Sequence, residues 1–471
     1  MDNKEFRKQA HKMADWMADF IENIEERPVK SLVQPGEIFR QLPDSPPAKG
    51  EHIEAVIDDV NRIILPGITN WQSPNFFAYF PANSSYPSIL AEMITATLGA
   101  QCMVWETSPA AAELEEMTMN WLKEMTGIPQ GFGGVIQDSA STSTLVAVLS
   151  ARERKSQFSI NDKGFEGNVF RVYCSSEAHS SVEKAVKIAG IGRHNLRKIE
   201  VDEQLAMDPG KLEEAILRDL KDGFLPTCVV AAVGTTGTVA MDPVADIARI
   251  CKKYGIWLHI DAAYAGSAMV LPEYRYLIAG IEDADSYVFN PHKWMFTNFD
   301  CSAYFVKDTE TLIRTFEILP EYLKTRADSV VNNYRDWGIQ LGRRFRALKL
   351  WFVIREMGVE GIREKIANHI SWTRELASQI RSEPGFKLFE PQNLALVCFA
   401  VVPDKVKDME GLNLLNLDFL HVLNSSGKVY LSHTKVGGTV YLRMQIGQTN
   451  VEREHVQKAW LFIKTEALKY L

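Results

Sequence analysis

Five short apolar runs in the middle of the chain place the tightest limit on how this sequence can fold. From about residue 85 the chain alternates between helical patterns and these runs, each bounded by Gly, Pro, Asn or Asp. Strands separated by helices predict a mostly parallel, buried sheet, which is an α/β fold. Ligands of such sheets bind beyond the carboxyl ends of the strands. The runs are Phe170–Tyr173, Cys228–Val233, Ile256–Ile260, Ser286–Phe289 and Ala303–Val306.

The same patterns predict three parts of the chain. Residues 1–84 open with an amphipathic helix, where Asp2 and Glu5 are spaced as in a capping box. This helix has two apolar faces and packs either on its own chain or on a partner subunit. Residues 85–345 form the large domain that carries the sheet. Residues 346–471 form a small α+β domain with a hairpin of Val429–Ser432 and Val440–Met444 around Gly437 and Gly438.

Composition argues against several classes of function. The chain has 471 residues and a net charge of -8, which disfavours binding to nucleic acid or to an anionic membrane. It has no apolar run of about 18 residues and no signal-peptide pattern, so we expect a cytoplasmic protein that does not bind membranes. The six cysteines are scattered, which predicts reduced, buried thiols. The ten histidines show no metal-ligand spacing, so we expect no metal.

Two charged residues directly follow predicted strands. Lys293 lies in Asn290-Pro-His-Lys-Trp294, where partial burial lowers a lysine pKa and favours the neutral amine that forms a Schiff base. Asp261 ends an apolar strand, and a carboxylate there needs a cationic partner such as a protonated pyridine nitrogen. Ala263 is small enough to let a flat ring approach. Taken singly, Lys293 could be a surface lysine and Asp261 a helix cap.

Three further motifs lie at similar junctions. Gln137–Thr144 opens a helix with small hydroxyl residues, which suits either a phosphate cradle or an ordinary cap. His179 precedes another helix and could stack on a ring or be structural. Thr235 and Thr236 could orient a cofactor or close a turn. The order of all five motifs, and their shared placement at strand ends, fit one ligand, pyridoxal 5'-phosphate (PLP).

Over nearly its whole length the chain resembles the aromatic-L-amino-acid decarboxylases of the PLP-dependent group II decarboxylase family. The resemblance implies the aspartate aminotransferase fold (fold type I of the PLP-dependent transferases). It also implies a homodimer in which the N-terminal arm packs on the partner subunit. It rests on the strings Ser73–Pro81, Gly134–Ser141, His179–Glu183, His259–Gly266, Asn290–Trp294 and Leu341–Arg346.

The resemblance also implies roles for individual residues. Lys293 would be the Schiff-base lysine, Asp261 would pair with the pyridinium nitrogen and His179 would stack on the ring. Further cofactor contacts would come from Ala140, Ser141, Thr236, Ala263, Asn290 and His292. The substrate's aromatic side chain would contact Trp71, Tyr79, Phe80, Pro81, Gln101, Met103 and Gly342.

The implied reaction is decarboxylation of aromatic L-amino acids (tryptophan, 5-hydroxytryptophan, DOPA, phenylalanine or tyrosine) to arylalkylamines and CO2. Residues 319–337 resemble the family's mobile catalytic loop and carry Tyr334, matched to its tyrosine proton donor. Related aldehyde synthases have phenylalanine there. Gly342 favours bulky aromatic substrates over histidine, although a helix glycine with a packing role is an alternative.

Two competing functions remain at this stage. An aldehyde synthase would couple decarboxylation to oxidative deamination, and the tyrosine at 334 together with His179 favours the amine-forming reaction instead. A non-catalytic scaffold on the same fold would form no covalent bond with PLP. The presence of Lys293, Asp261 and His179 argues against it.

Overall fold

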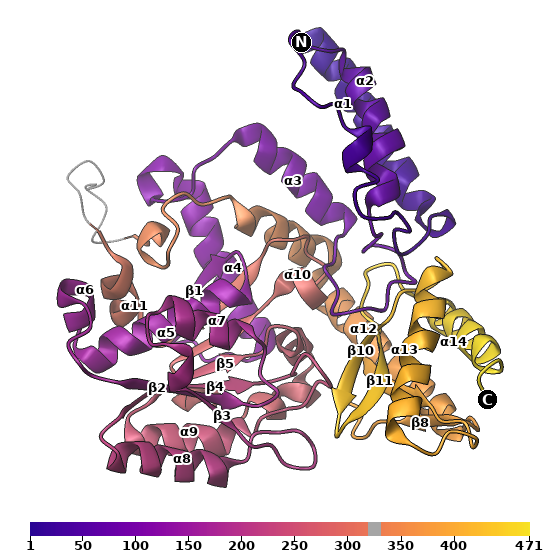
Figure 1. Ribbon diagram of the computed structural model, residues 1–471. Coiled ribbons are helices and arrows are strands. Elements are labelled where there is room, and N and C mark those ends of the chain that lie inside the picture. Colours follow the sequence, from indigo (N-terminus) through magenta and orange to yellow (C-terminus); the bar gives the residue numbers. More distant parts are fainter. Residues whose placement is uncertain (319–330) are drawn as a thin grey trace. The chain divides into compact units, whose positions relative to one another are not determined.

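The computed structural model describes residues 1–318 and 331–471 (Figure 1). It divides into two compact units. Unit 1 contains Met1–Pro81, Arg374–Phe389 and Val397–Leu471, and unit 2 contains Ala82–Thr373 and Glu390–Leu396.

Unit 2 is built on a seven-stranded sheet with the order β1-β7-β6-β5-β4-β2-β3. Only β7 is antiparallel to its neighbours β1 and β6, and the other pairs are parallel. The mostly parallel sheet is therefore confirmed, and each of the five apolar runs overlaps one of its strands. The strands are β1 Gly133–Gln137, β2 Phe170–Ser175, β3 Leu196–Ile199, β4 Leu225–Ala232, β5 Trp257–Asp261, β6 Ser286–Phe289 and β7 Ser302–Val306.

Helices cover both faces of this sheet (Figure 1). α5 and α7 lie on one side of it, and α8 and α9 lie on the other. The helices of unit 2 are α3 Tyr86–Leu98, α4 Pro109–Thr126, α5 Ala140–Ser156, α6 Ser159–Lys163, α7 Ser181–Ile188, α8 Pro209–Lys221, α9 Val244–Tyr254, α10 Pro291–Trp294 and α11 Thr309–Phe316. The long α12, Arg346–Ser382, begins in unit 2 and contains a break at Gly358, where φ is +67°.

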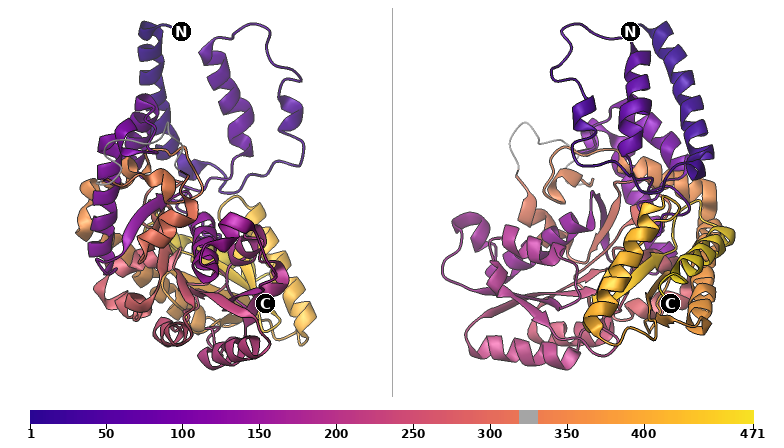
Figure 2. Two further views of the ribbon diagram at one scale, coloured as in Figure 1. Left: turned by 90° about the vertical axis from the view of Figure 1, so that its left-hand side faces the viewer. Right: turned by 45° about the vertical axis from the view of Figure 1, so that its right-hand side comes forward.

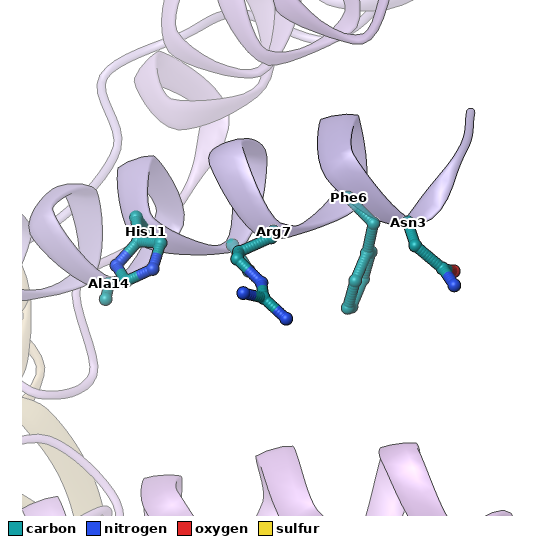
Figure 3. A pocket seen from close by; sticks show the side chains of 6 residues that line it. Asn3, Phe6, Arg7, His11 and Ala14 are labelled. Atoms are coloured by element: carbon teal, nitrogen blue, oxygen red, sulfur yellow. The ribbon is translucent and has the colours of Figure 1, made fainter.

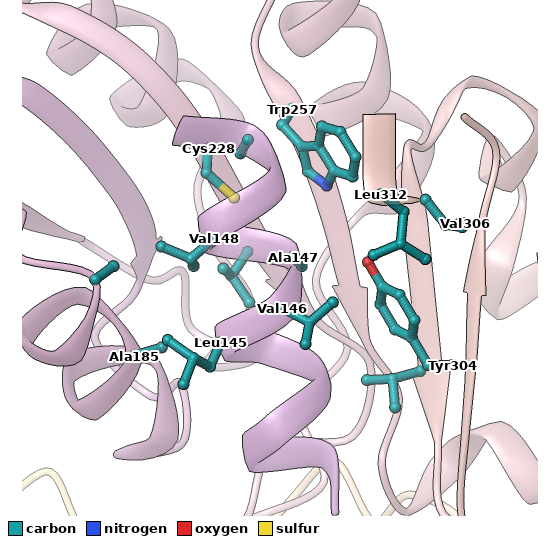
Figure 4. Close-up of a cluster of buried hydrophobic side chains, with 14 of the residues drawn as sticks. Leu145, Val146, Ala147, Val148, Ala185, Cys228, Trp257, Tyr304, Val306 and Leu312 are labelled. Atoms are coloured by element: carbon teal, nitrogen blue, oxygen red, sulfur yellow. The ribbon is translucent and has the colours of Figure 1, made fainter. Parts of the chain in front are cut away.

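The core of unit 2 is centred on α5. Six consecutive residues of this helix, from Ser143 to Val148, are buried, so it contacts other elements all round rather than along one stripe. Figure 4 shows its aliphatic side chains beside Cys228 of β4, Trp257 of β5 and Tyr304 of β7. This packing fixes the N-terminus of α5 at the edge of the sheet.

Unit 1 contains a four-stranded sheet with the order β10-β11-β9-β8. The predicted hairpin is confirmed, but its first strand begins at Ser432 rather than Val429, and it turns at Gly437 and Gly438 with φ of +54° and +85°. Helices α13 and α14 lie side by side (Figure 2). The elements are α1 Asn3–Glu22, α2 Ile53–Asp59, β8 Phe386–Leu388, β9 Leu396–Val401, α13 Met409–Ser425, β10 Ser432–Val436, β11 Thr439–Gln445 and α14 Arg453–Ala467.

Several local predictions can be compared with the described residues. Asp2 caps α1, because its carboxylate accepts a hydrogen bond of 2.8 Å from the Glu5 N–H. All six cysteines are free and buried, as predicted. In the part of the chain that the structure describes, no helix is long and apolar enough to cross a membrane, and no group of His, Cys, Asp or Glu is placed to hold a metal ion.

Buried histidines in unit 2 predict sensitivity to acid. Burial lowers the pKa of His259 to about 4, and that of His292 and His369 to about 3. In the unfolded chain each histidine takes up a proton as the pH falls below its ordinary pKa of 6.5. In the folded chain the same histidine stays neutral until a much lower pH. The free energy of unfolding should therefore fall as the pH falls below 6.5. At pH 5 the expected loss is about 2 kcal/mol per histidine.

Chemical denaturation between pH 7 and pH 5 measures this effect. The variant His259→Asn should show a shallower dependence on pH. The exposed His421→Asn should keep the full dependence. A free energy of unfolding that does not change over this range would contradict the prediction.

Candidate active site

The polar motifs predicted from the sequence meet at one edge of the unit 2 sheet. β1 is antiparallel to β7, which is itself antiparallel to β6, so β1 runs in the same direction as β6. The carboxyl ends of β1, β2, β4, β5 and β6 therefore share one edge, where α/β proteins bind ligands.

Lys293 lies on the short helix α10, directly after β6. Burial lowers the pKa of its ammonium, while the negative charge of Asp261 acts in the opposite direction. Removal of the lysine from water thus favours the neutral amine, the nucleophilic form.

Asp261 is the last residue of β5, and its backbone pairs with Ala232 of β4 and Val288 of β6. One carboxylate oxygen accepts a hydrogen bond of 3.0 Å from the Ala263 N–H. Gly266 lies in the turn that follows, and a Cβ there would lie 2.3 Å from Phe289 Cβ. This close packing explains why the turn after Asp261 needs a glycine.

His179 lies between β2 and α7. Its Nδ1 accepts a hydrogen bond of 3.1 Å from the Ser181 N–H and lies 2.8 Å from Ser181 Oγ. A nitrogen that accepts from an amide carries no proton, so the neutral ring has its proton on Nε2. Burial lowers the pKa of His179, Asp261 raises it and Lys293 lowers it. All three residues lie at the carboxyl edge of the sheet, and Asp261 and Lys293 are near enough to His179 for their charges to act on its pKa.

The N-terminus of α5 and the residues around α10 form a polar cradle beside these three groups. Ser139 caps α5 by accepting from the Thr142 N–H, so Ala140 and Ser141 lie in its first turn. Asn290 is 3% exposed, and its Oδ1 has no hydrogen-bond partner within residues 1–318 and 331–471. His292 is also buried, and its Nδ1 accepts a hydrogen bond of 2.9 Å from the Cys301 N–H, which leaves Nε2–H as a donor.

These residues fit PLP. A 17-residue helix N-terminus and the His292 N–H offer donors to a phosphate. The buried Asn290 Oδ1 without a partner marks a place for a hydrogen-bond donor. Lys293 offers an amine and Asp261 a carboxylate to the two ends of a pyridine ring. Thr236 is exposed in the turn after β4, where Gly234 adopts φ of +90° and a Cβ would lie 2.8 Å from Ala265 Cβ.

Gln101, Met103 and Gly342 are predicted substrate residues that unit 2 brings together. Gln101 Oε1 accepts a hydrogen bond of 2.6 Å from the Arg343 N–H, and the Met103 carbonyl accepts one of 2.9 Å from the Arg335 N–H. A Cβ added at Gly342 would lie 3.3 Å from Gln101 Nε2. Because Gly342 has no side chain, the Gln101 amide occupies part of the space beside it.

The other predicted substrate residues belong to unit 1, where they form an aromatic group. The ring centroid of Trp71 is 4.5 Å from that of Phe76 and 5.8 Å from that of Tyr79. The hydroxyls of Tyr79 and Tyr430 are 3.3 Å apart. Phe80 is 8% exposed and lies under the Arg443 guanidinium, next to the buried Pro81.

Tyr334, the predicted proton donor, opens the short helix Tyr334–Asp336. It is 2% exposed, its ring packs on Trp337 and the Arg343 guanidinium lies 4.9 Å from the ring centroid. Burial raises the pKa of its phenol well above the ordinary value of 10.0. Residues 319–330 of the predicted catalytic loop lie outside the described residues, so the role of Tyr334 rests on the resemblance.

Asn83 contacts α10 and was not foreseen from the sequence. Its Nδ2 donates to the Lys293 carbonyl over 2.7 Å, and its N–H donates to the His292 carbonyl over 2.9 Å. The polar run Asn83-Ser-Ser85 precedes α3 and reads as a helix cap, and no periodicity or motif links it to a lysine 210 residues away.

Comparison with known proteins identifies the family of this chain. Residues 35–402 match the family model described as the pyridoxal-dependent decarboxylase conserved domain. A phenylacetaldehyde synthase of Arabidopsis thaliana is 45% identical, over 99% of this chain and 96% of that protein. Tryptophan decarboxylase 2 of Oryza sativa subsp. japonica is 42% identical, over 100% of this chain and 96% of that protein.

A solved structure has the same fold. The crystal structure of Oryza sativa TDC with PLP and tryptamine superposes with a TM-score of 0.97 at 34% sequence identity, covering 100% of this chain and 99% of that one. The predicted fold type is therefore confirmed over the full length.

Proposed function

We propose that this chain, which belongs to the pyridoxal-dependent decarboxylase family, converts aromatic L-amino acids to arylalkylamines and CO2. The observation that carries the proposal is the grouping of Lys293, Asp261 and His179 at the carboxyl edge of the sheet. When bound, PLP withdraws electrons from the bond to the departing carboxylate.

The chain's own residues have separate tasks in this proposal. Lys293 would hold the cofactor through its amine. Asp261 keeps a proton on the pyridine nitrogen by its negative charge. His179 covers the ring, with Nδ1 held by Ser181. The first turn of α5, with the Nε2–H of His292 and the amide N–H groups of Asn290, would bind the phosphate.

One experiment separates the amine-forming reaction from aldehyde synthesis. The purified protein with PLP is given tryptophan, 5-hydroxytryptophan, DOPA, tyrosine, phenylalanine and, as a non-member of the class, histidine. We expect amine and CO2 in equal amounts from an aromatic substrate. Aldehyde, ammonia and hydrogen peroxide as main products would instead favour the aldehyde synthase, a function that the Arabidopsis relative's name also supports.

We also propose a homodimer in which the N-terminal arm contacts the second copy. One face of α1 presents Phe6 with Arg7 and His11 around a hollow (Figure 3), and Phe6 is 61% exposed in the single chain. Ala10 and Ala14 also line this hollow, and an apolar patch with polar residues at its rim is typical of an interface. Sedimentation of the full chain and of Phe6→Glu tests the proposal, because the charged variant should dissociate more readily.

Tyrosine substitutions should identify the proton donor. We expect Tyr334→Phe to raise the fraction of aldehyde among the products. A phenol that protonates the substrate carbon prevents oxidation of that carbon, so loss of the phenol should favour oxidation. Product ratios from matched substrate concentrations measure this. Tyr322→Phe is the necessary comparison, since Tyr322 is the other tyrosine of the predicted loop and lies outside the described residues. An aldehyde fraction raised only by Tyr322→Phe would transfer the role to Tyr322.

A serine at position 342 should narrow the substrate range. Its Cβ would lie close to Gln101 Nε2, so the Gln101 amide would shift towards the substrate's ring. We expect Gly342→Ser to lower kcat/KM for tryptophan about tenfold relative to tyrosine. Gly361→Ser is the control, because a Cβ there would meet only Met357 at an ordinary 3.8 Å. An unchanged ratio of the two kcat/KM values would contradict the assigned role of Gly342.

A further inference from the structure

The indole of Trp294, next to Lys293, is held on two sides. Trp294 is fully buried, and its ring stacks on Tyr264 with centroids 4.7 Å apart and planes inclined by 14°. Its Nε1–H donates a hydrogen bond of 3.0 Å to Nδ1 of His369 on α12. A buried indole N–H requires an acceptor, and His369 supplies it.

The surroundings of His369 fix its protonation state. The ring is 1% exposed, with Phe296 and Trp372 as aromatic neighbours and Lys365 as a nearby cation. Burial first, and then the charge of Lys365, lower its pKa to about 3. The neutral ring that accepts on Nδ1 carries its proton on Nε2.

The helix that carries Lys293 is too short to be stabilised by its own hydrogen bonds. α10 spans only four residues, and a helix of this length has almost no hydrogen bonds of its own. Its orientation therefore depends on hydrogen bonds to other elements, which come from the backbone of His292 and from three side chains. Asn83 binds the carbonyl of Lys293, the His292 ring binds the Cys301 N–H, and the Trp294 indole binds His369.

We propose that His369 is a positioning residue for the lysine that holds the cofactor. By accepting the Trp294 N–H, it fixes the end of α10 and so the direction in which the Lys293 side chain leaves the backbone. This rests on the proposed function only in that Lys293 is taken to bind PLP. None of the site roles predicted from the sequence includes His369 or Trp294.

Three substitutions at position 369 separate positioning from mere packing. Asparagine places an oxygen where His369 has Nδ1, glutamine places its amide near the position of Nε2, and phenylalanine fills the space without an acceptor. The full-length apoprotein of each is mixed with PLP, and the visible absorption band of the lysine-bound cofactor is followed with time. The melting temperature of each apoprotein is measured alongside.

We expect His369→Phe and His369→Gln to slow covalent capture of PLP about tenfold and to lower kcat similarly, with KM within twofold. His369→Asn should recover both rates to within about threefold of the parent. In a Trp294→Phe background, which lacks the N–H, exchange of His369 for phenylalanine should add no further loss.

Equal capture rates for the parent, His369→Asn and His369→Phe would overturn the proposal. The proposal would also be overturned if the losses in capture rate and kcat followed the melting temperature alone and were the same for His369→Asn and His369→Gln. If His369→Phe does not fold, the asparagine and glutamine pair decides alone. Capture of PLP without amine formation by the parent would reject the proposed function and leave this inference intact.

Discussion

Lys293→Ala is expected to abolish amine formation, with a fall in kcat on the order of 10³-fold or more. The variant lacks the amine whose charge acts on His179 and whose own pKa responds to Asp261. Purified Lys293→Ala mixed with PLP should also lack the visible absorption band of the lysine-bound cofactor. A band of parental intensity would show that another amine holds the cofactor.

Lys123→Ala is the matched control for this variant. Lys123 is likewise a buried lysine with a pKa lowered by burial. Its Nζ, however, donates to the carbonyls of Gln130 and Phe132, in the segment between α4 and β1. We expect this variant to lose stability and to keep the absorption band, so burial of a lysine alone cannot account for the loss in Lys293→Ala.

Capture of PLP by Lys293 should also depend on pH in a defined direction. Only the neutral amine is nucleophilic, and burial lowers the Lys293 pKa from 10.5. The capture rate should therefore rise with pH and level off below pH 10.5. Because Asp261 stabilises the ammonium form, Asp261→Asn should move the rise to still lower pH.

The sequence predicted five of the seven strands, and the two it missed lie at the edges of the sheet. β1 begins with Gly133 and Gly134, where a Cβ would lie 2.3 Å from Thr309 Cγ2 and 2.8 Å from Met119 Cε. Close packing requires glycine at both positions. The start of β1 therefore lacks the β-branched residues from which a strand is usually predicted. β3 pairs only with β2 and carries Arg197 and Lys198, so its composition is that of an edge rather than of a core.

The candidate site was predictable where a residue lies at the end of a strand or shortly after it. Asp261 ends β5, Lys293 lies on the short helix after β6 and His179 lies in the segment after β2, so strand direction brings all three to one edge. The contacts of Asn83 and His369 could not be predicted, because each joins α10 to an element remote in sequence. Such contacts depend on tertiary packing, which leaves no local pattern.

Asp261→Asn is expected to lower kcat/KM by about 10²–10³-fold, the usual cost of removing one preorganised electrostatic partner. Asparagine keeps an oxygen that can accept from the Ala263 N–H, so the turn after β5 should persist. The variant should still capture PLP and show its absorption band. The carboxylate charge is then the only difference between the two enzymes at this position.

The matched control is a carboxylate at the opposite end of β5. Asp285 accepts from the Leu258 N–H over 2.8 Å and pairs with Arg154, away from the carboxyl edge. Asp285→Asn should lower stability and leave kcat/KM within a few fold. Because Asp261 acts on charge that develops during the reaction, its loss should appear in kcat more than in KM. An Asp261→Asn enzyme within tenfold of the parent would mean that the ring nitrogen needs no carboxylate, and that the charge of Asp261 serves only to adjust Lys293 and His179.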